Sequence, residues 1–171
     1  MKEYNIDKLE YVNSGAFGYY FKLNEKQGIK IIKDLRYSFA WNEYKILQKF
    51  SRSGFTPKPF EVVKALVNRK KSFNCRYGTE QIKKGEYRGI VMEHIDGIEL
   101  TNYDRNYDEK YRSYPRPKIL RDIYYRLCKN LEQNFKAHIG DRHGENVLVV
   151  LLPNNQYKLY VIDLSPDSVN L

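Results

Sequence analysis

A hairpin pattern in the second half of the chain constrains the fold more than any other feature. Two apolar, β-rich runs, residues 147–152 and 157–162, flank a turn sequence at 153–156, and this pattern predicts two antiparallel strands. A symmetric register about the turn places Asn146 opposite Asp163, and directly opposed residues lie roughly 5 Å apart. An amide oxygen and a carboxylate would then form a pair of hard oxygen ligands suited to Mg²⁺. The alternative is that both residues only cap strand ends.

The remaining pattern predicts an α+β architecture, with strands and one helix in the first half and a helical second half. The predicted strands cover residues 10–12, 19–23, 28–32, 60–67 and 89–92. The first predicted helix covers residues 38–50, with Ser38 as its N-cap, and residues 68–86 form a polar stretch. The second helix, residues 117–133, has an apolar face for the core, made of Ile119, Leu120, Ile123, Tyr124, Leu127 and Leu131.

Composition excludes several classes of protein. The net charge is +9 over 171 residues, but the basic residues are scattered, so we do not expect a nucleic-acid partner. The two cysteines, Cys75 and Cys128, are too few for a disulfide framework or a metal site and are expected to be free thiols in a reducing compartment. No apolar run is long enough for a membrane span, so we expect a cytosolic protein.

Residues 138–148, HIGDRHGENVL, carry the most specific motif. Asp141 stands five positions before Asn146, and an apolar strand follows. This spacing resembles the catalytic loop of the protein-kinase-like superfamily. The local sequence Gly-Asp-Arg-His is most similar to the same loop in the phosphatidylinositol 3/4-kinase branch of that superfamily. Residues 161–165, VIDLS, then stand in the place of the metal-binding Asp-Phe-Gly motif of kinases.

The resemblance extends to the first third of the chain. Residues 12–18, VNSGAFG, are similar to the glycine-rich loop of kinases, with Asn13 in place of the first glycine. In residues 27–32, QGIKII, period-two alternation places Gly28 and Lys30 on one face. Lys30 would be the phosphate-binding lysine, and Gly28 would leave space for adenine. Lys33 is the alternative, but it would place the bulky Ile31 against the nucleotide.

Two further segments complete the resemblance. Glu43 lies on an otherwise apolar helix face, where a carboxylate is costly unless a cation meets it; it stands where kinases offer a glutamate to the lysine. Residues 90–100, IVMEHIDGIEL, resemble the kinase hinge. Met92 would lie behind the adenine, and the backbone from Glu93 to Ile95 would form hydrogen bonds with it.

The resemblance implies a bilobal kinase-like fold in a single domain, with a β-rich N-lobe at 1–93, a hinge at 94–98 and a truncated, mainly helical C-lobe at 99–171. It implies ATP and Mg²⁺ as cofactors. The implied nucleotide-binding residues are Gly15, Ala16, Phe17, Gly18, Lys30, Met92, Glu93 and Ile95. The implied catalytic residues are Asp141, Lys30, Glu43 and His143, and the implied metal ligands are Asn146 and Asp163. His143 is equally well explained as a residue that stabilises its loop.

Only eight residues follow Asp163, so we expect no activation loop and no switching by loop phosphorylation. The size and the motif order resemble the minimal effector kinases that bacterial pathogens inject into host cells, one group of which acts on the 90-kDa heat-shock chaperone. We therefore expect a monomeric Ser/Thr protein kinase with a protein substrate, such as a host chaperone. The alternatives are a small-molecule or lipid kinase, an ATP-binding pseudokinase and an AMP-transferring enzyme of the same fold.

Overall fold

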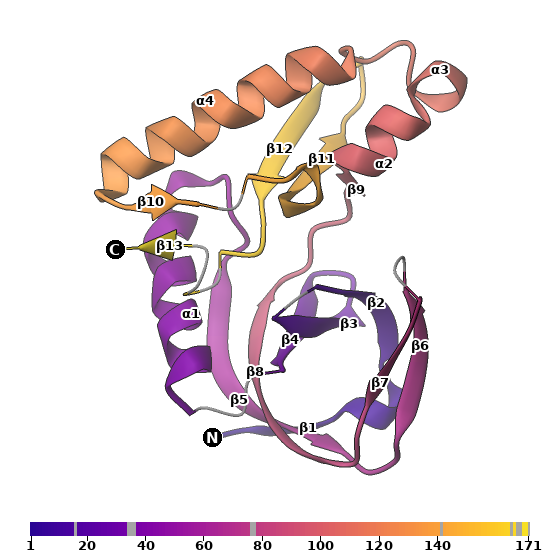
Figure 1. The fold of residues 1–171 in the computed structure, drawn as a ribbon, viewed down its shortest axis with the longest axis vertical. Coiled ribbons are helices and arrows are strands. Elements are labelled where there is room, and N and C mark those ends of the chain that lie inside the picture. The colour runs from indigo at the N-terminus through magenta and orange to yellow at the C-terminus, as the bar shows by residue number, and fades with distance from the viewer. Residues whose placement is uncertain are drawn as a thin grey trace. The chain divides into compact units, whose positions relative to one another are not determined.

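A computed structural model describes residues 1–15, 17–33, 37–75, 78–140, 142–164, 166 and 169–170. It is a mixed α+β structure (Figure 1). The chain folds into two compact units, which we call unit 1 (Met1–Lys45 and Lys58–His94) and unit 2 (Ile46–Pro57 and Ile95–Leu171). The change of unit after His94 falls at the expected hinge. Residues 46–57, which we expected in the first lobe, group with unit 2.

A six-stranded sheet with the order β1-β5-β8-β4-β3-β2 forms unit 1 (Figure 1). All neighbouring strands are antiparallel except β1 and β5, which are parallel. The strands are β1 (Glu3–Asn5), β2 (Glu10–Ser14), β3 (Gly18–Asn24), β4 (Gln27–Ile32), β5 (Pro59–Val67) and β8 (Gly85–Glu93). Helix α1 (Tyr37–Phe50) lies between β4 and β5 in the chain, and its last turn groups with unit 2. Because α1 begins at Tyr37, Ser38 lies inside the first turn, and its expected role as N-cap is wrong.

Alternation along β3 and β4 separates the two faces of the sheet, as the sequence predicted for β4. One face carries the hydrophobic core of unit 1, which includes the fully buried side chains of Phe21, Ile29 and Ile31. Gly28 and Lys30 therefore point to the other face. The candidate nucleotide-binding residues of β4 are thus separated from the core by the sheet itself.

A second hairpin, β6 (Lys71–Cys75) and β7 (Gly78–Ile82), lies in the polar stretch 68–86, for which the sequence analysis had named no strand. Its apolar content is low, but Phe73 stacks on Tyr11 with ring centroids 4.2 Å apart and meets Phe21 edge to face at 5.6 Å. Ile82 is buried in the same core. A strand with one or two anchoring side chains has too little periodicity to be recognised in sequence.

Unit 2 consists of helices and short strands. The helices are α2 (Leu100–Arg105), α3 (Tyr107–Lys110) and α4 (Pro117–Phe135). The strands β9 (Ile98–Glu99), β11 (Val147–Leu151) and β12 (Tyr157–Val161) form a three-stranded sheet with the order β12-β11-β9. A separate two-stranded sheet pairs β10 (His138–Ile139) with β13 (Val169–Asn170). The sequence predicted α4 and both hairpin strands, but not α2, α3 or the two-residue strands.

Helix α4 packs through a narrower stripe than expected. Leu120, Tyr124, Cys128 and Leu131 are buried. Their spacing of three and four residues keeps them on one side of the helix. Ile119 lies off this stripe and is 49% exposed, so its predicted place in the core is wrong. Cys128 is a free thiol, as predicted, and its burial raises the pKa of the thiol to about 11; the side chain of Cys75 lies outside the described residues.

The core of unit 1 can be tested by removing its central ring. Phe21→Ala deletes a fully buried side chain and should lower the free energy of unfolding by about 3–5 kcal/mol. Phe60→Ala is the matched control, because the Phe60 ring is 40% exposed and its loss should cost less than about 0.5 kcal/mol. Urea titrations followed by circular dichroism measure both values. Equal losses in the two variants would contradict the assigned core.

Candidate functional site

A buried ion pair joins β4 to α1. Lys30 Nζ lies 2.7 Å from Glu43 Oε1, and the two side chains are 13% and 1% exposed. Glu43 is otherwise surrounded on its helix face by buried apolar residues, Phe39, Ala40 and Ile46 among them. The contact predicted between Lys30 and Glu43 is therefore confirmed. An ammonium held in this way has a defined position on the sheet face opposite the core.

The glycine-rich turn between β2 and β3 is closed by backbone hydrogen bonds. Gly15 N–H donates to Gly18 O at 3.0 Å, and Lys33 N–H donates to Phe17 O at 3.0 Å. The Phe17 ring stacks on Phe39 of α1 with centroids 6.1 Å apart. The N–H of Gly15 thus donates inside the turn, and Ala16 lies outside the described residues.

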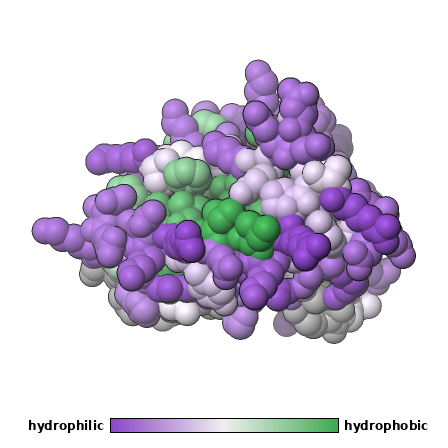
Figure 2. All heavy atoms as spheres, turned by 90° about the horizontal axis from the view of Figure 1, so that it is seen from above, coloured by the Kyte–Doolittle hydropathy of each residue, from purple (hydrophilic) through white to green (hydrophobic). Residues whose placement is uncertain are grey.

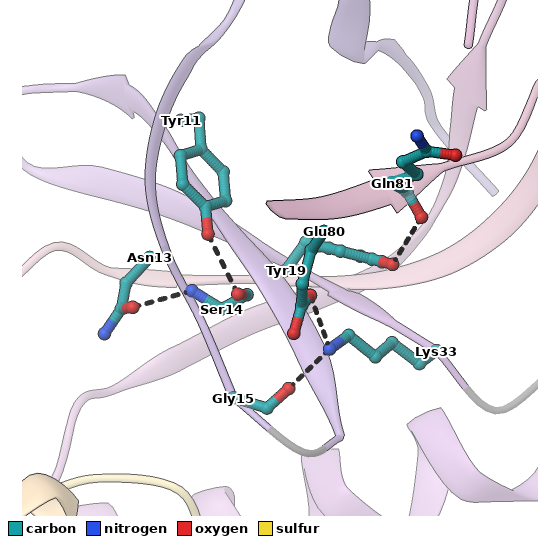
Figure 3. Close-up of polar contacts among 8 residues, drawn as sticks. All are labelled: Tyr11, Asn13, Ser14, Gly15, Tyr19, Lys33, Glu80 and Gln81. Atoms are coloured by element: carbon teal, nitrogen blue, oxygen red, sulfur yellow. Dashed lines mark hydrogen bonds and ion pairs between the residues drawn. The ribbon is translucent and has the colours of Figure 1, made fainter. Parts of the chain in front are cut away.

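Lys33, the alternative to Lys30, has a different set of partners (Figure 3). Its ammonium donates to Gly15 O at 2.7 Å and to Glu80 Oε2 at 2.8 Å, and it lies 4.6 Å from the centre of the Tyr19 ring. The Tyr19 hydroxyl in turn donates to Gln81 O at 2.9 Å. Lys33 therefore fastens the glycine-rich turn to β7, which favours Lys30 as the candidate phosphate ligand. The sequence analysis missed Glu80, because β7 was not predicted.

The end of β8 carries the segment that resembles a hinge. Met92 is 6% exposed and lies opposite Gly28 in the ladder. Glu93 N–H donates to Lys58 O at 2.8 Å, and His94 N–H donates to Lys26 O at 3.0 Å. These two N–H groups thus serve the fold of unit 1. The predicted contacts of an adenine with Glu93 would have to use its carbonyl.

The space above Gly28 is filled, contrary to the prediction that it is open for adenine. A Cβ atom at position 28 would lie 2.1 Å from Tyr20 Oη and 2.3 Å from Tyr20 Cζ. Tyr20 is opposite Lys30 in the β3–β4 ladder and so shares its face. The small residue therefore accommodates a neighbouring tyrosine ring.

The hairpin in unit 2 has a register one residue away from the predicted one. Val147 pairs with Val161 and Leu151 with Tyr157, and Leu152 N–H donates to Gln156 O at 2.8 Å. The loop consequently has three residues, 153–155, and Asn154 and Asn155 both have positive φ angles of 59° and 57°. Asparagine accepts this left-handed backbone more readily than most residues, and the sequence pattern had assigned a four-residue turn instead.

Because of this register, Asn146 lies opposite Ile162 and not opposite Asp163. Ile162 N–H donates to Asn146 O at 2.9 Å, and Asn146 is 9% exposed. Asp163 is the next residue, and its φ angle of 57° turns the chain out of the extended conformation. The ladder therefore does not determine the direction of its carboxylate, but both residues remain at the open end of the hairpin.

The oxygen donors of Asn146 and Asp163 fit Mg²⁺, which binds few protein ligands and prefers carboxylate and amide oxygens. Backbone strain of the kind found at Asp163 is concentrated at functional sites. Within the described part of the chain, no three His, Cys, Asp or Glu side chains are grouped as a metal site.

Glu132, near the end of α4, organises the loop that carries the kinase-like motif. Its Oε1 accepts hydrogen bonds from Ile139 N–H at 2.7 Å and from the Arg142 guanidinium, and lies 3.0 Å from His138 Nδ1. Burial opposes ionisation, but the bonds from Ile139 and Arg142 outweigh it and lower the pKa of Glu132. Sequence reasoning missed this residue, since an acidic residue late in a helix is ordinarily a solvent-facing one.

The motif itself is only partly described. Asp141, the predicted catalytic residue, lies outside the described residues. His143 is exposed and precedes the 3-10 helix Gly144–Asn146, whose Asn146 N–H donates to His143 O at 3.0 Å. A Cβ atom on Gly144 would lie 2.8 Å from Thr101 Oγ1, so this glycine allows close packing on α2.

No model of a known protein family matches the chain, and no curated protein matches it either. Among the described residues, none of the helices combines the length and the apolar character that crossing a membrane requires. The assignment of function consequently depends on the residues themselves.

The Lys30–Glu43 pair can be tested through stability. Lys30→Ala leaves a carboxylate that is 1% exposed without its cation and should cost about 3–5 kcal/mol. Lys30→Met combined with Glu43→Leu should recover most of this loss, because the buried charge is then removed altogether. Urea unfolding of the single and double variants measures the coupling, with Lys64→Ala on the sheet surface as control. If Lys30→Ala lowered the free energy of unfolding no more than Lys64→Ala does, the burial of the pair would be contradicted.

The role of Glu132 predicts a pH-dependent stability. Its pKa is lowered in the folded state from the usual 4.5, so its contribution is fully present above that value and is lost as the pH falls through the folded pKa. Glu132→Gln should therefore lower the free energy of unfolding by about 1–3 kcal/mol at neutral pH, and the difference from the wild type should shrink below pH 4.5. Unfolding curves between pH 3 and 8 measure this, with Glu109→Gln as the exposed control. If the difference in unfolding free energy between the wild type and Glu132→Gln were constant over this pH range, the proposed role of the Glu132 carboxylate would be contradicted.

Proposed function

We propose that this chain is an ATP- and Mg²⁺-dependent phosphotransferase with a minimal protein-kinase-like fold. The observation that carries the proposal is the buried pair between Lys30 and Glu43. Burying two charges costs several kcal/mol in solvation, and the pair replaces apolar residues that would stabilise the same position at least as well. A fixed ammonium on the sheet face opposite the core of unit 1, beside a glycine-rich turn, is suited to binding phosphate.

Unit 2 supplies the second part of the proposed chemistry. Asn146 and Asp163 both lie at the open end of one hairpin, and their side chains are of the kind that Mg²⁺ prefers as ligands. The bound Mg²⁺ would neutralise the charge of the transferred phosphoryl group. Glu132 holds the preceding loop in place, which is the positioning that phosphoryl transfer requires of a protein.

The roles of the remaining residues follow from the sequence resemblance. Lys30 would bind the α and β phosphates of ATP, with Glu43 to orient it. Asp141 would orient or deprotonate the acceptor hydroxyl, and His143 would assist it.

We further propose that the acceptor is a Ser or Thr hydroxyl of a protein. Large apolar side chains are exposed on unit 2, among them Ile119, Tyr125 and Leu152, and Figure 2 shows an apolar patch within a mostly hydrophilic face. Patches of this kind are typical of surfaces that contact other proteins. The resemblance to effector kinases makes a host protein, such as a chaperone in the cytosol of the host cell, the first substrate to test.

Radiolabelled ATP distinguishes this function from its alternatives. Purified protein is incubated with Mg²⁺ and either γ-labelled or α-labelled ATP, alone and with bacterial or eukaryotic lysate. The proposal predicts label from the γ position only, in protein bands, and a loss of about 100-fold in Asp163→Asn, because the metal ligand is removed. Asp122→Asn, an exposed aspartate on α4, is the matched control and should keep full activity.

Other outcomes point elsewhere. Label from the α position would indicate AMP transfer, and label in lipids or small molecules would indicate a different acceptor. Binding of ATP without any transfer would indicate a pseudokinase. Activity that survives in Asp163→Asn at the level of the control would contradict the assigned metal site.

A further inference from the structure

An open hollow in unit 2 lies between α3, the segment that follows it and the first turns of α4 (Figure 1). Its volume is about 690 Å³, which is in the range of sites for small ligands. Most of the residues that line it are charged. Four are cations and two are carboxylates, which gives a formal charge of +2: Arg112, Arg116, Lys118 and Arg121, with Asp104 and Asp108.

Two of these cations stand at a place where a helix disfavours them. Helix α4 begins at Pro117, with Arg116 as its N-cap and Lys118 in its first turn, and this turn contains no acidic residue. The N-terminal end of a helix carries a partial positive charge, which favours anions and opposes cations. An arginine N-cap also has no acceptor for the first N–H groups of the helix. A bound anion would compensate all of these charges.

The cations of the hollow differ in their partners. Arg121 forms an ion pair with Asp104 of α2. In the part of the chain that the structure describes, no carboxylate forms an ion pair with the other three cations. Their side chains are exposed, so the charges can be reached by a ligand: Arg112, Arg116 and Lys118.

Tyrosine side chains hold the segment 111–116, which carries two of the arginines. The hydroxyl of the buried Tyr103 donates to Pro115 O at 2.8 Å, and the Tyr107 hydroxyl donates to Tyr114 O at 3.2 Å. Burial raises the pKa of Tyr103 to about 12, so this hydroxyl keeps its proton at physiological pH and remains a donor. The segment is therefore fixed to the helices on which the hollow is built.

The backbone of Arg116 is restricted further by the prolines on both sides of it. Pro117 disfavours the helical region for the residue before it, and Arg116 is extended, with φ −59° and ψ 146°. The rings of Pro115 and Pro117 fix the φ angles of their own residues. A cation on a fixed backbone loses less conformational freedom when it binds a ligand.

We propose that this hollow is a binding site for a single phosphate monoester on a protein partner, a phosphoserine or phosphothreonine side chain. Such a group carries about −1.5 to −2 charges at pH 7, which matches the formal charge of the hollow. Guanidinium groups bind phosphate through pairs of N–H donors, and clusters of arginines are a recurring means of recognising phosphorylated peptides.

The two carboxylates favour an isolated phosphate over a polyanion. A nucleic acid or an anionic membrane would bring further negative charges close to Asp104 and Asp108, and like charges repel. A peptide with one phosphate avoids this repulsion. Ile119 follows Lys118 in the chain and is 49% exposed, so it offers an apolar contact to residues that flank the phosphate. Binding here requires neither ATP nor the residues of the proposed phosphotransferase site.

Fluorescence anisotropy with the full chain and no nucleotide tests this site at low ionic strength. The probes are a fluorescein-labelled alanine-rich peptide with one phosphoserine and the same peptide with serine. The wild type should prefer the phosphopeptide, and Arg116→Gln should weaken its binding by about 10-fold, because a charge-assisted hydrogen bond is lost. Arg126→Gln is the matched control: it removes an exposed cation of α4 outside the hollow and should bind like the wild type.

Thermal unfolding of the same variants separates a ligand-binding role of Arg116 from a structural one. Arg116→Gln removes a cation from the positive end of a helix, so the melting temperature without peptide should stay unchanged or rise. The proposal is overturned if the wild type does not prefer the phosphopeptide, or if Arg116→Gln binds it like Arg126→Gln. A melting temperature lowered in Arg116→Gln alone would make the residue structural. Tighter binding of a labelled ten-nucleotide oligouridylate than of the phosphopeptide would overturn the choice of ligand.

Discussion

The contact between Lys30 and Glu43 is the interaction on which the candidate site depends. Glu43 is buried on a helix face that otherwise contacts the apolar interior, and the ammonium of Lys30 compensates its charge there. The pair therefore fixes α1 relative to β4 and fixes the ammonium on the sheet face opposite the core of unit 1. The glycines at 18 and 28 follow from the same geometry, because the long side chains on this face need space to lie flat.

Residues from elements that are far apart in the chain contact the glycine-rich turn or the lysine that holds it. Lys33, which follows β4, reaches a carbonyl of the turn and the carboxylate of Glu80 on β7. Phe17 stacks on Phe39 of α1. In unit 2, Glu132 has the corresponding role for the loop at 138–142, through one backbone N–H and one guanidinium. In both units a charged side chain from a neighbouring element organises the segment that carries the candidate chemistry.

The predictions from sequence were correct where the signal was local. Alternation in β4, the apolar face of α1, the helix α4 and both strands of the β11–β12 hairpin are present as predicted, although the buried stripe of α4 is narrower than expected. The hairpin register was wrong by one residue, because two asparagines with positive φ shorten the loop to three residues and spacing alone does not reveal backbone conformation. The β6–β7 hairpin was missed because its stability comes from rings on β2 and β3, which are distant in the chain.

By itself, the sequence determined which residues are candidates for chemistry. A glutamate on an apolar face requires a cation, and Asn146 and Asp163 flank a hairpin of two apolar, β-rich strands, so these residues could be named without coordinates. Only the tertiary structure showed that Lys30 pairs with Glu43 and Lys33 with Glu80, identified the role of Glu132, and placed Tyr20 against Gly28. These outcomes depend on which side chains meet across strands and helices, and such contacts are set by packing in three dimensions and not by the order of residues along the chain.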